Sequence, residues 1–191
     1  MDNERTAVIT IGDEEYTLLL TTKATKEIAG RYGGLENLGE KLMKSENFEM
    51  AIGEIVWLIT LLANQSILIH NLKDKEHPKE PLTEDVVELL TTPLDLAGYK
   101  TAITEALYKG TKRNVESEKD SKNAPGVTVS DAELFTRLLY YGLAHLHLSQ
   151  DEVWLMPFGL LLDLWECHKQ YNGRATPARE HYIDDIIPDG I

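Results

Sequence analysis

The most constraining feature of this sequence is a stretch of fifteen residues, 55–69, that contains no charged side chain. Apolar residues occupy most faces of the helix that this stretch would form, and such a helix is usually surrounded by other elements. The stretch is shorter than the roughly 20 apolar residues that a membrane span needs. Asn64, Gln65 and Ser66 also interrupt it with groups that are costly to bury in lipid. The stretch therefore predicts the central helix of a folded core rather than a membrane span.

The charge of the chain narrows the classes of partner. Its 191 residues include 19 basic and 32 acidic side chains, which gives a formal net charge of 19 − 32 = −13. Phosphates repel an acidic protein that has no compensating basic patch, and the one local basic cluster is Lys109, Lys112 and Arg113. The single cysteine, Cys167, excludes an internal disulfide framework and suits a reducing compartment. We expect a cytoplasmic protein with no nucleic-acid partner and no membrane partner.

The strand-forming residues and helix start signals in the remainder of the chain predict a mainly α fold with an N-terminal β-hairpin. Residues 8–11 and 16–20 are rich in strand-forming side chains, and a short Gly/Asp-containing loop joins them. A hairpin alone is marginal in water, so one face must pack on helices. Thr22, Ser45 and Thr83 are expected helix caps, and Thr92 with Pro93 is a further start signal that Gly110 would end. The expected helices run over about 22–31, 35–44, 46–71, 84–90 and 93–109.

Composition divides the chain into four parts. Residues 1–113 form the hairpin and a helical body, and residues 114–127 have the polar, Pro/Gly-ending composition of a flexible linker. Residues 128–171 form a small unit of three helices that begin at Ser130, Ser149 and Pro157. Ser130 with Glu133 and Ser149 with Glu152 match the capping-box spacing. Residues 172–191 form a polar tail in which Ile183, Ile186 and Ile187 are apolar.

The strongest candidate for catalysis is the run Glu166-Cys167-His168, because a thiol beside an imidazole can serve as an activated nucleophile. Successive residues on a helix point about 100° apart, so these side chains would not face one another. No glycine-rich phosphate loop or dinucleotide fingerprint is present. We predict no catalytic residue, no cofactor and no enzyme.

Two histidines form a His-x-His pair, His145 and His147. They would bind zinc only if the fold brought them to Cys167 or His168, because no second ligand pair has a standard spacing. The alternative is a pair of histidines at a helix C-terminus, where the helix dipole favours positive charge. We predict no metal site.

Four large side chains gather in the small unit, namely Trp154, Met156, Phe158 and Trp165. They would form its core, or part of the cluster would be an exposed anchor for a partner, as at many interfaces.

The order of these parts resembles the tail assembly chaperones of long-tailed, siphovirus-like phages. The hairpin 9–16, the helical body, the linker and the small helical unit follow the same order, and the resemblance covers most of residues 7–171. The more specific similarity lies in 138–168. There, Leu-Ser-Gln-Asp-Glu-Val-Trp at 148–154, Met-Pro-Phe-Gly at 156–159 and Leu-Asp-Leu-Trp at 162–165 look like the C-terminal extension of that family.

The resemblance implies a phage or prophage protein that binds the tape-measure protein through its body and recruits tail tube subunits through its extension. In that family the extension often arises by a programmed ribosomal frameshift. The chaperone would act in the host cytoplasm, would be absent from the mature virion, and would have the capacity to self-associate. No binding residues carry over individually. Two alternatives stay open, a non-enzymatic helical adaptor such as a head–tail connector component or regulator, and a small enzyme that uses Cys167.

Overall fold

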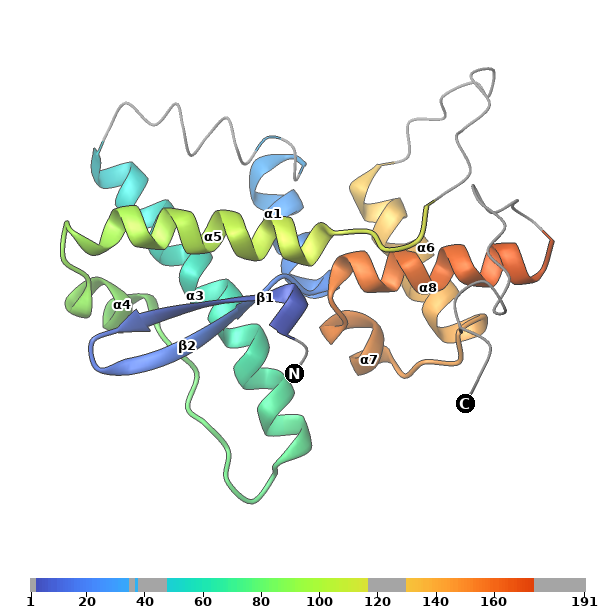
Figure 1. The fold of residues 1–191 in the computed structure, drawn as a ribbon, viewed down its shortest axis with the longest axis horizontal. Helices are drawn as coiled ribbons and strands as arrows, with labels where there is room; N and C mark the ends of the chain where they lie inside the picture. The colour runs from blue at the N-terminus through green and yellow to red at the C-terminus, as the bar shows by residue number, and fades with distance from the viewer. Residues whose placement is uncertain (1–2, 35–36, 38–47, 117–129, 174–191) are drawn as a thin grey trace, which may run out of the picture.

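The computed structural model describes residues 3–34, 37, 48–116 and 130–173. It confirms the mainly helical fold with an N-terminal antiparallel hairpin (Figure 1). The elements are η1 (Asn3–Arg5), β1 (Thr6–Ile11), β2 (Glu14–Leu19), α1 (Thr22–Tyr32), α3 (Phe48–Lys73), α4 (Glu84–Leu90), α5 (Asp95–Thr111), α6 (Asp131–Ala144), α7 (Gln150–Leu155) and α8 (Phe158–Tyr171). We call residues 3–116 the body and residues 130–173 the C-terminal unit.

The hairpin is held between two long helices, with β2 packed on α3 and β1 packed on α5. The buried face of β1 consists of Ala7, Ile9 and Ile11, while Val8 between them is half exposed. Both strands of this small sheet accept hydrogen bonds from helix side chains, since Ser66 Oγ donates to Thr17 O and Lys109 Nζ donates to Thr6 O. Packing and edge pairing together stabilise a hairpin that would be marginal alone.

Helix α3 is the centre of the body core, as the uncharged stretch predicts. Its residues Ile55, Val56, Leu58, Ile59 and Leu62 are fully or almost fully buried. Among the described residues, Ile52–Lys73 is also the one helix that is long and apolar enough to cross a membrane, and 44% of the tested window is buried in the fold.

Two buried or partly buried amides of α3, those of Asn64 and Gln65, bond to neighbouring elements of the body. The Asn64 amide exchanges two hydrogen bonds of 2.8 Å with the backbone of Leu82, and Thr21 Oγ1 donates to Gln65 Oε1 at 2.8 Å. These amides are therefore satisfied inside the protein, as buried polar groups must be.

Several of the predicted helix ends are confirmed. Thr83 caps α4 by accepting a hydrogen bond from the N–H of Val86. Ser149 and Glu152 form both halves of a capping box at the start of α7. Pro157 directly precedes α8, which runs to Tyr171 as expected.

Other predicted ends are wrong. The N-cap of α1 is Thr21 rather than Thr22. Thr92 does not cap α5, which begins three residues later at Asp95; instead the Asp95 carboxylate accepts hydrogen bonds from the Thr92 N–H and hydroxyl. Gly110 does not end α5 but lies inside it, where a Cβ would come within 2.4 Å of Leu20 Cβ. This glycine is required for close packing rather than for a helix stop.

The Ser130 cap of α6 is confirmed, but the capping box with Glu133 does not form. Ser130 Oγ accepts from the Glu133 N–H, but the Glu133 carboxylate pairs with Arg137 instead of returning to the Ser130 backbone. The predicted helix 35–44 and the Ser45 cap lie outside the described residues, except for Asn37.

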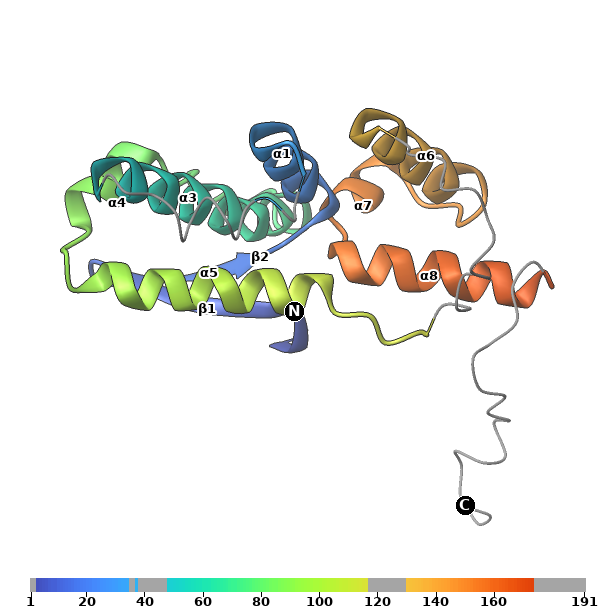
Figure 2. The same cartoon turned by 90° about the horizontal axis from the view of Figure 1, so that it is seen from above.

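The C-terminal unit packs against one end of the body. Seen from above, α5 and α8 lie nearly end to end, and α7 lies close to α1 (Figure 2). The core of the unit consists of Phe135, Leu138, Val153 and Leu161 together with Ala29, which belongs to α1 of the body. The unit therefore completes its core with a residue of the body.

Candidate partner-binding groove and its polar junction

The two units are joined along the backbone, where residues 20–22 after β2 pair with residues 156–158 after α7. The Thr22 N–H donates to Met156 O at 3.0 Å, and the Phe158 N–H donates to Leu20 O at 3.2 Å. Thr21 and Pro157 form an antiparallel bridge between these two bonds. This short pairing directly follows α7, which packs on α6 and on α1 of the body.

An open groove lies between α3 and α7, and we call it the interunit groove. It consists of two connected hollows of about 630 Å³ and 510 Å³ that share Leu72, Asp151 and Leu155. Its apolar lining comes from both units: Leu19, Leu68, Ile69, Leu72, Trp154, Leu155, Met156, Pro157 and Leu160.

Apolar side chains in this groove remain open to solvent. Leu72 is 47% exposed and Leu68 is 36% exposed. Trp154 forms part of the opposite wall, and Lys26 Nζ lies 5.0 Å from the centre of its ring. A tryptophan and leucines in a concave site with charged residues at its edge form the kind of surface into which an amphipathic helix docks.

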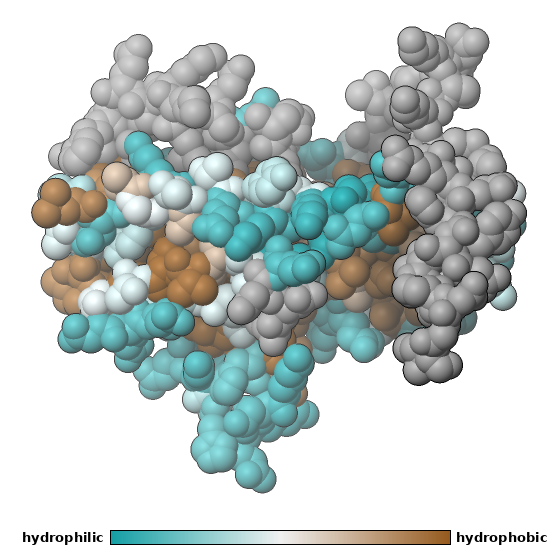
Figure 3. All heavy atoms as spheres, in the orientation of Figure 1, coloured by the Kyte–Doolittle hydropathy of each residue, from teal (hydrophilic) through white to brown (hydrophobic). Residues whose placement is uncertain are grey.

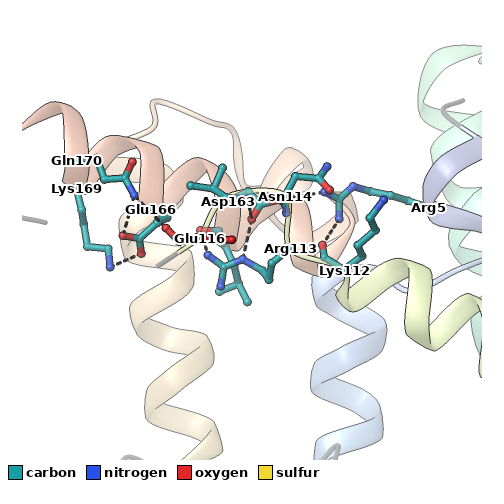
Figure 4. Close-up of polar contacts among 11 residues, drawn as sticks. Arg5, Lys112, Arg113, Asn114, Glu116, Asp163, Glu166, Lys169 and Gln170 are labelled. Carbon is teal, nitrogen blue, oxygen red and sulfur yellow. Dashed lines mark hydrogen bonds and ion pairs between the residues drawn. The ribbon is translucent and has the colours of Figure 1, made fainter. Parts of the chain in front are cut away.

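A buried carboxylate behind the groove holds the units together (Figure 4). Asp163 of α8 receives Arg5 Nη2 at 3.1 Å and Arg113 Nε at 2.7 Å. The side chains of Asp163 and Arg5 are only 5% and 7% exposed. Arg5 Nη1 also donates to Lys112 O at 2.7 Å. Three distant segments of the chain therefore meet at one polar cluster, which we call the Asp163 junction.

Backbone groups complete the Asp163 junction. The Asn114 N–H donates to Asp163 Oδ2 at 2.9 Å, and the Val115 N–H donates to Oδ1 at 3.2 Å. Burial alone would raise the pKa of Asp163, but the hydrogen bonds from Asn114, Arg113 and Val115 outweigh it and hold this pKa below its ordinary value. The carboxylate is thus charged and fully bonded at neutral pH.

The junction also depends on a glycine. A Cβ at Gly159 would lie 2.3 Å from Lys112 O and 2.8 Å from Arg5 Nη1. Only a residue without a side chain allows α8 to approach the end of α5 this closely.

The segment after α5 differs from a free linker where the structure describes it. Residues 114–116 are held on α8, because Asn114 and Val115 bond Asp163 and the Glu116 carbonyl accepts from Gln170 Nε2 at 3.2 Å. The predicted flexible linker 114–127 is therefore wrong for its first three residues, and 117–127 lie outside the described residues. The reason is the buried acid of α8, which captures the backbone as it leaves α5.

The structure separates the three residues of the candidate catalytic run. Glu166 is buried and pairs with Lys169, and Cys167 is exposed to solvent. The ring of His168 stacks on Trp165 with centroids 5.5 Å apart. The three side chains take separate directions, as successive positions on a helix must.

Two of the candidate metal ligands do meet. The rings of His145 and His168 lie 5.5 Å apart between centroids, and Asn172 Nδ2 is 3.1 Å from His168 Nε2. His147 occupies a left-handed backbone conformation just beyond α6. Among the described residues, no group of three or more His, Cys, Asp or Glu side chains is placed to hold a metal ion.

The four large side chains of the C-terminal unit divide between the two predicted roles. Met156 and Phe158 pack against its core, and Trp165 stacks on Tyr141 at 4.1 Å. Trp154 and Met156 pack on the core and also line the interunit groove. The core interpretation and the partner-anchor interpretation therefore meet at these two residues.

A second apolar surface lies at the other end of the body. Leu89 of α4 is 84% exposed and Leu94, in the turn before α5, is 90% exposed, and Val86 and Leu90 of α4 are also exposed. We call these four residues the α4–α5 patch. Figure 3 shows apolar surface in separate patches among hydrophilic side chains, including one over α4 and the start of α5 at the left of the view.

Sequence reasoning missed the interunit groove and the Asp163 junction. Leu68 and Leu72 match the apolar pattern of a core helix, and no local pattern pairs Arg5 with a residue 158 positions away. Comparison with known proteins adds no relative: no family model, no curated protein and no solved structure matches this chain.

Proposed function

We propose that this chain is a phage or prophage tail assembly chaperone that binds a helical segment of the tape-measure protein in the interunit groove and recruits tail tube subunits. The single observation that carries the binding role is the groove itself, an open apolar site with Trp154 and Leu72 on opposite walls. The choice of partner rests on the resemblance of residues 138–168 to the family's C-terminal extension.

The physical demands of this role agree with the surface of the chain. A long helical protein that is bare of its partners exposes apolar faces, and a chaperone must cover them without aggregating itself. A net charge of −13 keeps such a complex dispersed by mutual repulsion. An amphipathic helix that docks by its apolar face needs a groove rather than a catalytic site.

The Asp163 junction changes how recruitment would work. With the C-terminal unit docked on the body, a tube subunit bound to that unit would be held at a fixed place beside the bound tape measure. We therefore propose a rigid adaptor, in place of the flexible tether that the sequence predicts.

The proposal is tested by co-expressing the tagged chain with the tape-measure and tube proteins encoded beside it, followed by affinity recovery and mass spectrometry. Leu72→Asp and Trp154→Ala should each lower tape-measure recovery about tenfold or more, because both remove central apolar anchors. The matched control is Leu94→Asp, which introduces the same charge on the α4–α5 patch and should leave this recovery unchanged. Equal recovery with all three variants would contradict the proposal.

The α4–α5 patch favours a second candidate, a helical adaptor that assembles into a dimer or ring. Leu89 and Leu94 are almost fully exposed, which is uncommon for a surface that meets only water. Sedimentation of the full chain would distinguish the two candidates. A discrete oligomer that Leu94→Asp dissociates, together with no recovery of the tape measure, would support the adaptor.

A further inference from the structure

The interunit groove contains apolar side chains that no described residue covers. Leu68 and Leu72 are partly exposed on one wall, and Trp154 and Leu155 line the other. Contiguous apolar sites of this kind usually have an occupant. The sequence contains a segment with matching chemistry outside the described residues.

We propose that the C-terminal tail, residues 174–191, occupies the interunit groove of its own chain when no partner is bound. The tail contains Ile183, Ile186 and Ile187. Their spacing of i, i+3 and i+4 is that of side chains that share one side of a helical turn. Three branched apolar residues on one side match a groove whose walls are leucine and tryptophan.

Charge supports the same occupant. Lys23, Lys26 and Lys73 line the groove, and none of them forms an ion pair with another described residue. Asp184 and Asp185 lie within the apolar run of the tail. Four acidic residues also line the groove, namely Glu4, Glu27, Asp151 and Glu152, and the Glu152 carboxylate already accepts from the Ser149 N–H at 2.7 Å. Asp184 and Asp185 would have the ammonium groups of Lys23 and Lys73 beside the apolar walls, while the Lys26 ammonium already lies over the Trp154 ring.

The tail is long enough to reach from the end of α8 back to the interunit groove. The groove lies at the N-terminal end of α8, because Met156, Pro157 and Leu160 line it. Helix α8 has 14 residues, so that its far end is about 21 Å away along its axis. The ten residues from Gly173 to Ile183 span up to about 33 Å when extended.

Such a tail would act as a built-in competitor. An intramolecular segment is present at a high effective concentration, so that even weak contacts keep a groove covered. Any partner of the groove would have to displace the tail first. This inference does not require the tape-measure protein to be that partner, and its test uses the chain alone.

The test measures how fast a thiol in the groove is modified. In the full chain with Cys167→Ser, Leu72→Cys is labelled with a small maleimide, with and without Ile183→Asp, Ile186→Asp and Ile187→Asp together. A tail that occupies the groove about nine-tenths of the time slows labelling about tenfold, and the three aspartates should remove this protection. Asp184→Lys with Asp185→Lys should remove part of it.

The matched control is Leu94→Cys in the same background, whose labelling rate should not change with the tail variants. Three outcomes would overturn the inference. The first is an equal labelling rate of Leu72→Cys with the wild-type tail and with the tail that carries the three aspartates. The second is an equal change at Leu94→Cys, which would indicate a general effect of charge. The third is protection that rises with protein concentration, which would identify a second copy as the occupant.

Discussion

The body and the C-terminal unit are stabilised in different ways. The body has a large apolar core around α3, in which Ile55, Ile59 and Leu62 are completely enclosed. The C-terminal unit has a small core that includes Ala29 of the body, and a buried carboxylate fixes it in place. Small cores leave little net stability. The comparison indicates that the C-terminal unit keeps its fold by docking, and that the interunit groove exists only while it is docked.

The largest expected effects come from the two cores. Leu62→Ala and Leu161→Ala remove side chains that are 0% and 1% exposed, and each should lower the free energy of unfolding by about 3–4 kcal/mol. The units should respond differently. Leu62→Ala should destabilise the whole chain, whereas Leu161→Ala should release α6–α8 first. Hydrogen exchange read by mass spectrometry checks this, and uniform exchange in both variants would show that the units do not differ.

The next largest effect comes from the Asp163 junction. Asp163→Asn leaves Arg5 buried without its counter-charge and should cost about 3 kcal/mol in the free energy of unfolding or docking. Glu133→Gln is the control, because it also neutralises an acid paired with arginine, but on an exposed helix face. That change should cost about 0.5 kcal/mol or less. Similar losses in denaturant melts of both variants would mean that the junction is not a special contact.

The ionisation of Asp163 determines how the stability that the Asp163 junction provides depends on pH. Because the pKa of folded Asp163 lies below its ordinary value, its stabilising contribution is complete above the ordinary pKa and is lost as pH falls through the folded pKa. The stability difference between wild type and Asp163→Asn should therefore be constant from pH 7 to about 5 and shrink below about pH 4. Urea melts across this range measure it. A difference that grows on acidification would contradict the assigned charge state.

A smaller effect is expected from the contact between α5 and α8. Gly159→Ala places a methyl group against Lys112 O and should lower the free energy of unfolding by about 2 kcal/mol. Gly98→Ala is the matched change, since nothing lies within 4 Å of a Cβ at this position in the first turn of α5. It should stabilise the chain by about 0.5–1 kcal/mol through helix propensity. Thermal melts measure both changes. If both variants shift the melting temperature in the same direction, α8 does not approach α5 so closely.

The sequence predicts the local features of this fold well. The Thr83 cap, the Ser149–Glu152 capping box and the buried stretch of α3 each depend on residues within a few positions of one another. Local hydrogen bonds and apolar periodicity determine such features, so that a single sequence is sufficient to recognise them.

Features that depend on distant segments could not be predicted. Gly110 matches a helix stop in the sequence, but its role is set by Leu20, which is 90 positions earlier and packs directly against it. The polar residues after α5 have the composition of a linker, yet Asp163 binds the first of them. The interunit groove was missed for the same reason, because Leu72 and Trp154 face each other only after docking.

The C-terminal unit is docked on the body and thereby forms the groove. The amides of Thr22 and Phe158 report this directly, since each donates a hydrogen bond across the two units. Their hydrogen exchange should be measured by NMR in wild type and in Asp163→Asn. Both amides should be strongly protected in wild type and should lose this protection in the variant, while Leu62 and its neighbours in α3 stay protected. Exchange of both amides at unprotected rates in wild type would contradict this docking.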